Sequence, residues 1–167
     1  MSLFNDIEES TTRMTMTPLN FLLTAAVAGV LGGVAMEGVL WLIGRAGWAK
    51  ANMLIALGSM VTKSRENAWQ VGALLHTISA IGFALIYTWL MVRTGFSHMP
   101  LSMMLGLGAG FVHGLIVSLA LVWIVAERHP LPEFNEATLA IGLSHLVRHV
   151  AYGGVVGLVV GFSALVK

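Results

Sequence analysis

The stretch PLNFLLTAAVAGVLGGVAMEGVLWLIG, residues 18–44, decides the fold of this 167-residue chain, and its single charged side chain is that of Glu37. A helix needs about 20 apolar residues to cross a hydrocarbon core about 30 Å thick. Because lipid offers no partners to backbone N–H and C=O groups, such a segment must pair them internally as a helix. We therefore predict a transmembrane helix that begins at Pro18, where a missing N–H costs nothing.

Three further segments have the length and apolar character of membrane spans, at about 69–93, 103–126 and 137–166. The tryptophans lie near the proposed ends of the spans, where amphipathic rings prefer the membrane interface. The chain is 57% hydrophobic and 10% charged, whereas a soluble domain is about a quarter charged. The sequence thus predicts an all-α fold: one four-span transmembrane domain at 18–167, preceded by a polar tail at 1–17.

The connection between the first two spans, residues 45–68, contains a further helical pattern. We predict a short amphipathic helix at about 49–63 that lies on the membrane surface. Its expected apolar face holds Met53, Leu54, Leu57, Met60 and Val61, and its other sides hold Lys50, Asn52, Ser59 and Lys63. The other two connections, 94–102 and 127–136, are short, which favours an up-down bundle of antiparallel neighbours.

The distribution of Lys and Arg predicts the orientation of the chain in the membrane. The side with the two connections 45–68 and 127–136 carries five of these residues, and the other side carries three. This bias favours both termini outside the cytoplasm. The first 17 residues lack the basic start and cleavage site of a signal peptide, so the first span is expected to remain in the mature protein.

Charge and cysteine content exclude several classes of function. A net charge of +1 gives no indication of a nucleic-acid partner. The chain has no cysteine, which excludes disulfides, thiolate metal sites and thiol catalysis. No serine or paired-carboxylate hydrolase pattern is present either, so we do not expect the chain to be an enzyme by itself.

The stretch LSHLVRHVAYGG, residues 143–154, interrupts the fourth apolar span with polar side chains. His145, Arg148, His149 and Tyr152 follow one another at spacings of three and four, which places them on one stripe of a helix. Ionisable groups inside a membrane span are costly, and each is therefore a candidate for function.

Ionisable residues of the other spans are expected near the same depth. Glu37, His76 and His145 each lie seven or eight residues from the span end on the side of the longest connection, which is about 10–12 Å at 1.5 Å per residue. His149 is one turn deeper, and His113 is near the midplane. This convergence on one layer is the strongest functional signal in the sequence.

Structural roles account for part of this layer. Glu37 and Arg148 are expected to form a buried ion pair that fixes helix register. A lone intramembrane imidazole usually bonds to a neighbouring helix, which suits His113. Three further imidazoles in one layer exceed what register requires. His98 and His129 lie in connections and are expected to be solvated.

The favoured functional hypothesis is a redox cofactor, haem b or a transition metal, bound within a larger membrane electron-transfer complex. The residues expected to contact the cofactor are His76, His113, His145, Arg148, His149 and Tyr152. The residues expected to ligate a metal ion are Glu37, His76, His145 and His149.

Two alternatives stay open. The first is a site for a quinone or another lipophilic ligand, because His, Arg, Tyr and Glu suit carbonyl oxygens and proton exchange. The second is an accessory or assembly subunit of a membrane complex, in which the polar residues only fix helix packing. The expected partners are the lipid bilayer together with other membrane subunits or further copies of this chain.

Four stretches carry a resemblance to a known family: GVLGGVAMEG (29–38), LLHTISAIGFALIYTWL (74–90), GAGFVHG (108–114) and LSHLVRHVAYGGVVG (143–157). They resemble the YagU-like group of small bacterial inner-membrane proteins. The resemblance covers most of the chain and implies a four-helix membrane protein. It carries over no catalytic residues, and Arg148, His149 and Glu37 stand outside its pattern.

Overall fold

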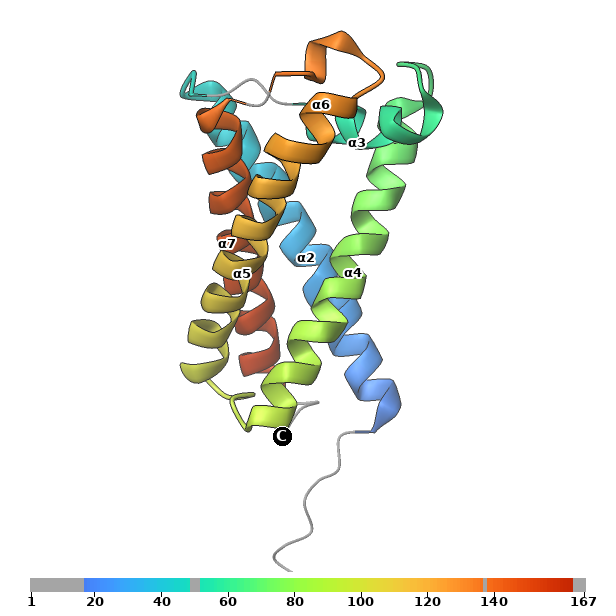
Figure 1. Cartoon of the computed structure of the whole chain (residues 1–167). Helices are drawn as coiled ribbons and strands as arrows, with labels where there is room; N and C mark the ends of the chain where they lie inside the picture. Colours follow the sequence, from blue (N-terminus) through green and yellow to red (C-terminus); the bar gives the residue numbers. More distant parts are fainter. Residues whose placement is uncertain (1–16, 49–51, 137, 164–167) are drawn as a thin grey trace, which may run out of the picture.

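The computed structural model describes residues 17–48, 52–136 and 138–163, so the predicted tail at 1–17 lies outside it except for its last residue. Four helical segments are long and apolar enough to cross a membrane (Figure 1): α2 (Pro18–Arg45), α4 (Ala68–Thr94), the continuous run Leu101–Arg128, and α7 (Leu139–Phe162). No β-strand occurs within the described ranges. The predicted all-α, four-span fold is confirmed, and the chain has the character of an integral membrane protein.

Capping residues set the beginnings of the first and last spans. Thr17 caps α2, where its Oγ1 accepts a hydrogen bond from the N–H of Asn20 at 3.2 Å. Thr138 caps α7 in the same way, accepting from the N–H of Ile141 at 3.3 Å. A capping residue has a non-helical backbone, so α7 begins only after Thr138 and is shorter than the predicted span 137–166. Residues 137 and 164–166 of that span lie outside the described chain.

The third span changes helical geometry towards its end. α5 (Leu101–Ala120) runs into a π-helical turn, η1 (Leu121–Val125), and then into α6 (Ala126–Arg128). A π turn shifts the register of the residues that follow it, and such turns are frequent at functional sites. A short 3-10 turn, η2 (Pro132–Phe134), lies in the connection to α7.

One pair of consecutive spans, α4 and α5, packs only loosely. α7 packs against α5 on one side and α2 on the other, and α4 packs against α3 and, among the spans, mainly against α2. α4 and α5 follow one another, yet they approach closely only near their connection and diverge towards the other end (Figure 1). The bundle is therefore up-down as predicted, but of the two spans next to α5 in the sequence only α7 packs closely against it.

Glycines explain why α5 packs closely against α7. A Cβ atom on Gly106 would overlap the carbonyl oxygen of Gly153, and one on Gly110 would overlap that of His149. Between helices in lipid, stability comes from close van der Waals contact, which small residues allow. The two backbones can meet only because these positions lack side chains.

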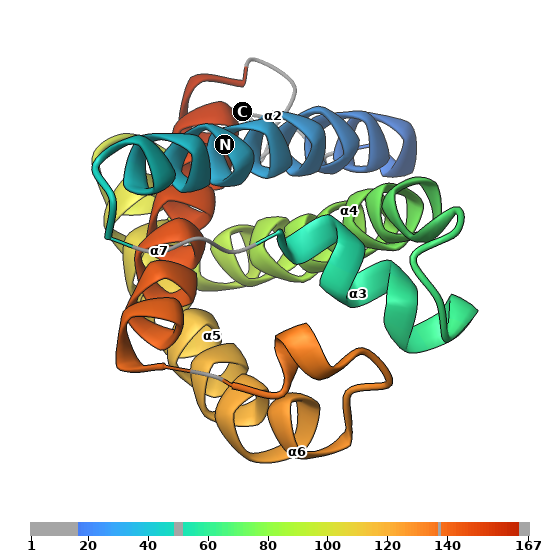
Figure 2. The ribbon, with the colours of Figure 1, turned by 90° about the horizontal axis from the view of Figure 1, so that it is seen from above.

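A short helix, α3 (Met53–Thr62), lies across one end of the bundle beside α4 (Figure 2). It begins after Asn52, whose Oδ1 accepts from the N–H of Ile55 at 3.2 Å, and it ends at Lys63 in a left-handed conformation with φ 57°. The helix predicted at 49–63 is thus present, although residues 49–51 lie outside the described chain.

The most buried residues of this helix, Gly58 and Ser59, lie off its predicted apolar face. Ser59, expected on the polar side, is fully buried, whereas Val61 is 61% exposed. The inward side is set by Gly58, which meets the backbone of α4 at Ala68 so closely that a Cβ atom would not fit. Burial of Ser59 carries little cost because its hydroxyl donates to the carbonyl of Ile55 at 2.6 Å.

The connection between the third and fourth spans folds onto α3. His129, expected to be solvated, is only 6% exposed. Its Nε2 lies 3.0 Å from the carbonyl oxygen of Ala56, and its ring packs 4.8 Å from the ring of Phe134. The prediction for His129 was wrong because α3 covers this end of the bundle. His98, in the opposite connection, is exposed as expected.

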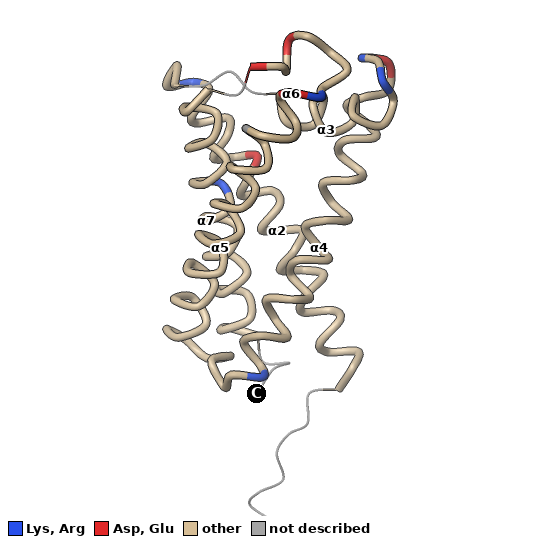
Figure 3. Tube along the Cα trace, in the orientation of Figure 1, with Lys and Arg blue, Asp and Glu red and all other residues tan. Residues whose placement is uncertain are grey.

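Charged residues gather at the end of the bundle that carries α3 and α6 (Figure 3). An ion pair of 2.6 Å between Arg65 and Glu133 joins the two connections there. Away from the helix ends, α2 has one charged residue, Glu37, and α7 has one, Arg148. These two charges inside the bundle mark the region of the candidate site.

Candidate functional site

Arg148 forms the most buried charged contact of the described chain. Its side chain has 0% exposure, and its Nη2 donates to Oε1 of Glu37 at 2.6 Å. Its Nε donates to the carbonyl oxygen of Met36 at 3.2 Å. The predicted ion pair between α2 and α7 is confirmed, and it offsets the cost of a guanidinium inside the bundle.

Glu37 has a second basic neighbour, because its Oε1 also lies 3.6 Å from Nε2 of His76 on α4. The side chain of Glu37 is 37% exposed, so the carboxylate stands at the boundary between the buried cluster and a more open region. Three helices thus meet at one oxygen atom, as the depth of these residues predicts.

The polar stripe of α7 is buried throughout, as its spacing predicts. Tyr152 donates its hydroxyl proton to the carbonyl oxygen of Ala80 at 2.5 Å, which ties α7 to α4. Nδ1 of His149 lies 2.7 Å from the carbonyl oxygen of His145. A carbonyl can only accept, so this bond places the ring proton on Nδ1 and leaves Nε2 as an acceptor.

A cavity of about 180 Å³ lies at the centre of the bundle, and we call it the central cavity. Its walls come from all four spans and from α3. Its titratable lining residues are His76, His113, His149 and Tyr152. Four of the six residues predicted to contact a cofactor therefore share one cavity.

Tyr87 is a site residue that the sequence analysis missed. Its hydroxyl lies 3.2 Å from Nδ1 of His113, and the His113 ring in turn stands edge-on to the His149 ring at 4.6 Å. Tyr87 follows His76 by 11 residues, which is three turns at 3.6 residues a turn. That spacing puts both residues on one face of α4, and it is the sequence feature from which Tyr87 could have been predicted as a site residue.

The structure does not bring the remaining predicted residues to the central cavity. His145 lines a separate cavity of about 80 Å³ beside the π-helical turn. The guanidinium of Arg148 is instead bonded to the carboxylate of Glu37. Within the described ranges, no group of three or more His, Cys, Asp or Glu residues is arranged to hold a metal ion. The four-ligand set of Glu37, His76, His145 and His149 is thus not assembled.

An apolar crevice of about 590 Å³ separates α4 from α5 where the two helices diverge, and we call it the lateral crevice. Ile86 and Leu90 of α4 face Met104 and Val112 of α5 across it. Phe83, His113 and Val117 belong to the walls of both the lateral crevice and the central cavity. His113 therefore lies where the lateral crevice and the central cavity adjoin.

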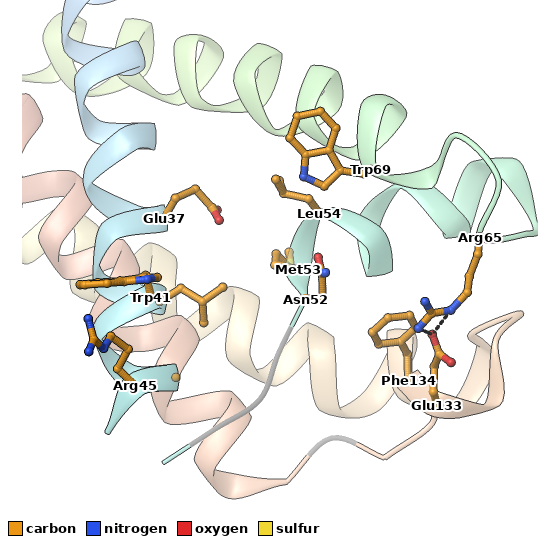
Figure 4. Close-up of a pocket in the computed structure, with 12 residues that line it drawn as sticks. Glu37, Trp41, Arg45, Asn52, Met53, Leu54, Arg65, Trp69, Glu133 and Phe134 are labelled. Atoms are coloured by element: carbon orange, nitrogen blue, oxygen red, sulfur yellow. Dashed lines mark hydrogen bonds and ion pairs between the residues drawn. The ribbon is translucent and has the colours of Figure 1, made fainter. Parts of the chain in front are cut away.

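A fourth pocket, open and of about 720 Å³, lies at the end of the bundle beside α3, and we call it the vestibule (Figure 4). Its walls include Trp41, Arg45 and Trp69, and the side chain of Glu37 points into it. The guanidinium of Arg45 lies 4.9 Å from the centre of the Trp41 ring. The buried cluster and this polar pocket thus meet at Glu37.

Comparison with protein families, with curated proteins and with solved structures found no match. Fold and site alone therefore define the class: a helical integral membrane protein with a histidine-lined cavity among its spans. The resemblance to the YagU-like group stays a prediction.

Proposed function

We propose that this protein binds a lipophilic molecule with a carbonyl-bearing polar head, of the quinone class. The head would occupy the central cavity and the apolar tail would lie in the lateral crevice. The observation that carries the proposal is that His113 stands in the walls of both. A ligand that enters from the bilayer would meet a hydrogen-bonding imidazole at the inner end of an apolar passage.

The chemistry around the central cavity suits both redox forms of such a head. An oxidised quinone offers only acceptor oxygens, and a reduced one also offers hydroxyl donors. Imidazoles can donate or accept, and the hydroxyl of Tyr87 forms a hydrogen bond of 3.2 Å with Nδ1 of His113. Nε2 of His149 is left as an acceptor because Nδ1 is bonded to the backbone. The cavity therefore supplies partners of both kinds.

The sizes of the two spaces support a divided ligand. Drug-sized molecules occupy pockets of about 300–1,000 Å³, so the central cavity of about 180 Å³ suits a small ring rather than a whole macrocycle. The lateral crevice of about 590 Å³ suits an apolar tail. His113 and His149 also contact each other at 4.6 Å, which leaves no space for a haem between them.

A redox cofactor, haem b or a transition metal in an electron-transfer complex, is the second candidate. One observation favours it: His149 donates from Nδ1 to a backbone carbonyl, the support that metal-binding imidazoles commonly have. The accessory-subunit hypothesis would apply if neither a ligand nor a cofactor is found.

The test uses protein purified in its native lipid and a decyl-benzoquinone as the probe. We expect saturable binding to the wild type. His113→Phe keeps the ring volume but loses the hydrogen bonds. It should weaken binding roughly tenfold, since an unmade buried hydrogen bond costs about 1–3 kcal/mol and 1.4 kcal/mol is tenfold. His98→Phe, in the exposed connection, is the matched control and should bind as the wild type does.

A visible spectrum and metal analysis of the same sample separate the candidates. Absence of probe binding together with a Soret band or one metal ion per chain would reject the quinone-class proposal and support the second candidate. Absence of all three would leave the packing role of an accessory subunit.

We further propose that the protein resides in the bacterial inner membrane with both termini outside the cytoplasm. The bias of Lys and Arg towards the end with α3 supports the orientation, and the resemblance to the YagU-like group supports the bacterial inner membrane. Because the chain has no cysteine, Glu66→Cys and Phe96→Cys can report the two sides. An impermeant thiol reagent should label Glu66→Cys only in inside-out vesicles and Phe96→Cys only in right-side-out vesicles.

A further inference from the structure

Glu37 belongs to two spaces at once. It lines the vestibule, and it also lines a groove of about 240 Å³ between α2 and α4 that it shares with His76. Its side chain is the point where the open end of the bundle meets the buried cluster. A carboxylate in this position can exchange protons with water in the vestibule.

His76 belongs to the next two spaces. It lines the groove shared with Glu37, and it lines the central cavity together with His113 and His149. Its Nε2 is buried without a hydrogen-bond partner among the described residues, and Oε1 of Glu37 lies 3.6 Å away. That separation is within reach of proton transfer after a small rotation or through one water molecule.

Arg148 holds the carboxylate in place for this contact. Its Nη2 donates to the same Oε1 that faces His76, while its Nε is bonded to the backbone of α2. The charged groups that face Glu37 are thus Arg148 from α7 and His76 from α4. In the vestibule they are joined by Arg45, Arg65 and Glu133.

We infer that Glu37 and His76 form a proton route from the vestibule to the central cavity. A hydronium ion in the vestibule gives a proton to the Glu37 carboxylate and becomes water, and the carboxylic acid passes the proton to Nε2 of His76, which becomes an imidazolium. The imidazole releases a proton from its other nitrogen into the central cavity, and His76 returns to its neutral form. No group is oxidised or reduced in these steps.

The purpose of this proton route depends on the proposed ligand, but the experiments that test the route do not. A quinone head takes up protons when it is reduced, and its tail in the lateral crevice faces lipid rather than water. The route lets those protons come from the aqueous side at the end with α3. The lipid-facing crevice then needs no water.

The first experiment measures, by NMR on ¹⁵N-histidine-labelled protein in lipid nanodiscs, how fast the ring N–H protons of His113 and His149 exchange with water. Glu37→Gln keeps an oxygen for Arg148 but carries no transferable proton. We expect it and His76→Phe to slow the exchange about a hundredfold, the lower range for a positioned proton-transfer group. Glu133→Gln, which removes the other carboxylate of the vestibule, is the matched control and should leave the exchange unchanged.

The second experiment leaves Glu37, His76 and Arg148 intact, so it does not depend on how the first variants fold. Because the chain has no cysteine, Asn52→Cys and Met104→Cys each offer one thiol, the former in the vestibule and the latter in the lateral crevice. A bulky thiol reagent at Asn52→Cys should slow exchange at the central histidines. The same reagent at Met104→Cys should not.

Unchanged exchange in Glu37→Gln, His76→Phe and labelled Asn52→Cys would overturn the proton route. So would an equal slowing in Glu133→Gln, or a slowing on labelling Met104→Cys alone, which would place the water entry in the lateral crevice. Binding of the decyl-benzoquinone to the wild type is scored separately. Slowed exchange without probe binding would keep the route and reject the quinone-class ligand.

Discussion

Arg148 on α7 and Glu37 on α2, 111 residues apart in the sequence, meet at 2.6 Å, and the guanidinium is fully buried while the carboxylate is partly open. The pair is therefore asymmetric. Loss of the carboxylate leaves a charge inside the bundle, whereas loss of the guanidinium leaves a charge that reaches the vestibule. This asymmetry gives the pair a structural role, and it leaves the carboxylate open to the vestibule for the proposed proton exchange.

Replacement of Glu37 should destabilise the bundle strongly. We expect Glu37→Leu to lower the free energy of unfolding by about 3–5 kcal/mol, the usual cost when one partner of a buried ion pair is removed. The double variant Glu37→Leu/Arg148→Met should recover a large part of this loss because no unpaired charge remains. Denaturant unfolding followed by circular dichroism measures both, and a double variant as unstable as the single one would contradict the ion-pair account.

The glycine contact between α5 and α7 should be intolerant of even one methyl group. A Cβ atom on Gly153 would overlap the carbonyl oxygen of Gly106. We expect Gly153→Ala to cost about 1–3 kcal/mol, as overpacking does. Gly38→Ala is the matched control, since no atom lies within 4 Å of its added methyl. Equal unfolding midpoints for the two variants would argue against the close helix contact.

The connection between the third and fourth spans should detach when His129 is removed. His129→Ala loses the contact with the carbonyl oxygen of Ala56 and the ring contact with Phe134. We expect faster amide hydrogen exchange in α3 and in 129–136, with a global cost of about 1 kcal/mol, typical of one hydrogen bond. His98→Ala, on an exposed residue, should leave exchange in these segments unaltered, and the same outcome for His129→Ala would contradict the docking.

The two buried tyrosines of the bundle should behave differently. The Tyr152 hydroxyl is bonded to the carbonyl oxygen of Ala80, whereas the Tyr87 hydroxyl is bonded to His113 at the junction of cavity and crevice. We expect Tyr152→Phe to lower the melting temperature and to leave probe affinity unchanged. Tyr87→Phe should weaken binding of the decyl-benzoquinone severalfold, since it removes the support of His113. A reversed pattern would place the ligand against Tyr152.

A bulky side chain in the lateral crevice should block the ligand without damage to the fold. Gly108 lines the crevice, and no atom lies within 4 Å of a Cβ atom placed on it. We expect Gly108→Phe to abolish probe binding while the melting temperature stays near that of the wild type. Gly82→Phe also adds its ring to open space, outside the crevice, and should bind normally. Normal binding to Gly108→Phe would reject the crevice as the ligand passage.

Local pattern accounts for much of the site. Spacings of three and four in 143–154 placed four polar side chains on one face, and that face is buried. Depth counting also placed Glu37 and His76 in one layer, where they lie 3.6 Å apart. The same count put His145 in this layer, yet His145 lines a different cavity. Depth gives the position along a helix axis, and it does not give the direction around it.

Some features depend on contacts between segments and had no local signal. The burial of Ser59 and His129 requires α3 to pack against α4 through Gly58. It also requires the connection between the third and fourth spans to cover α3. The sequence of α3 alone places Ser59 off the apolar face of the helix. Only the close approach of two backbones makes its position an interior one.

The amino-acid sequence by itself determined the class of fold and the chemistry available to it. Long apolar segments in lipid must be helices. A single Glu and a single Arg buried in two of these helices are expected to form an ion pair. The tertiary structure decided which helices are partners and where spaces remain. Glycines draw α5 towards α7 and away from α4, so the lateral crevice opens beside His113. That outcome depends on how four surfaces fit together, which no single segment encodes.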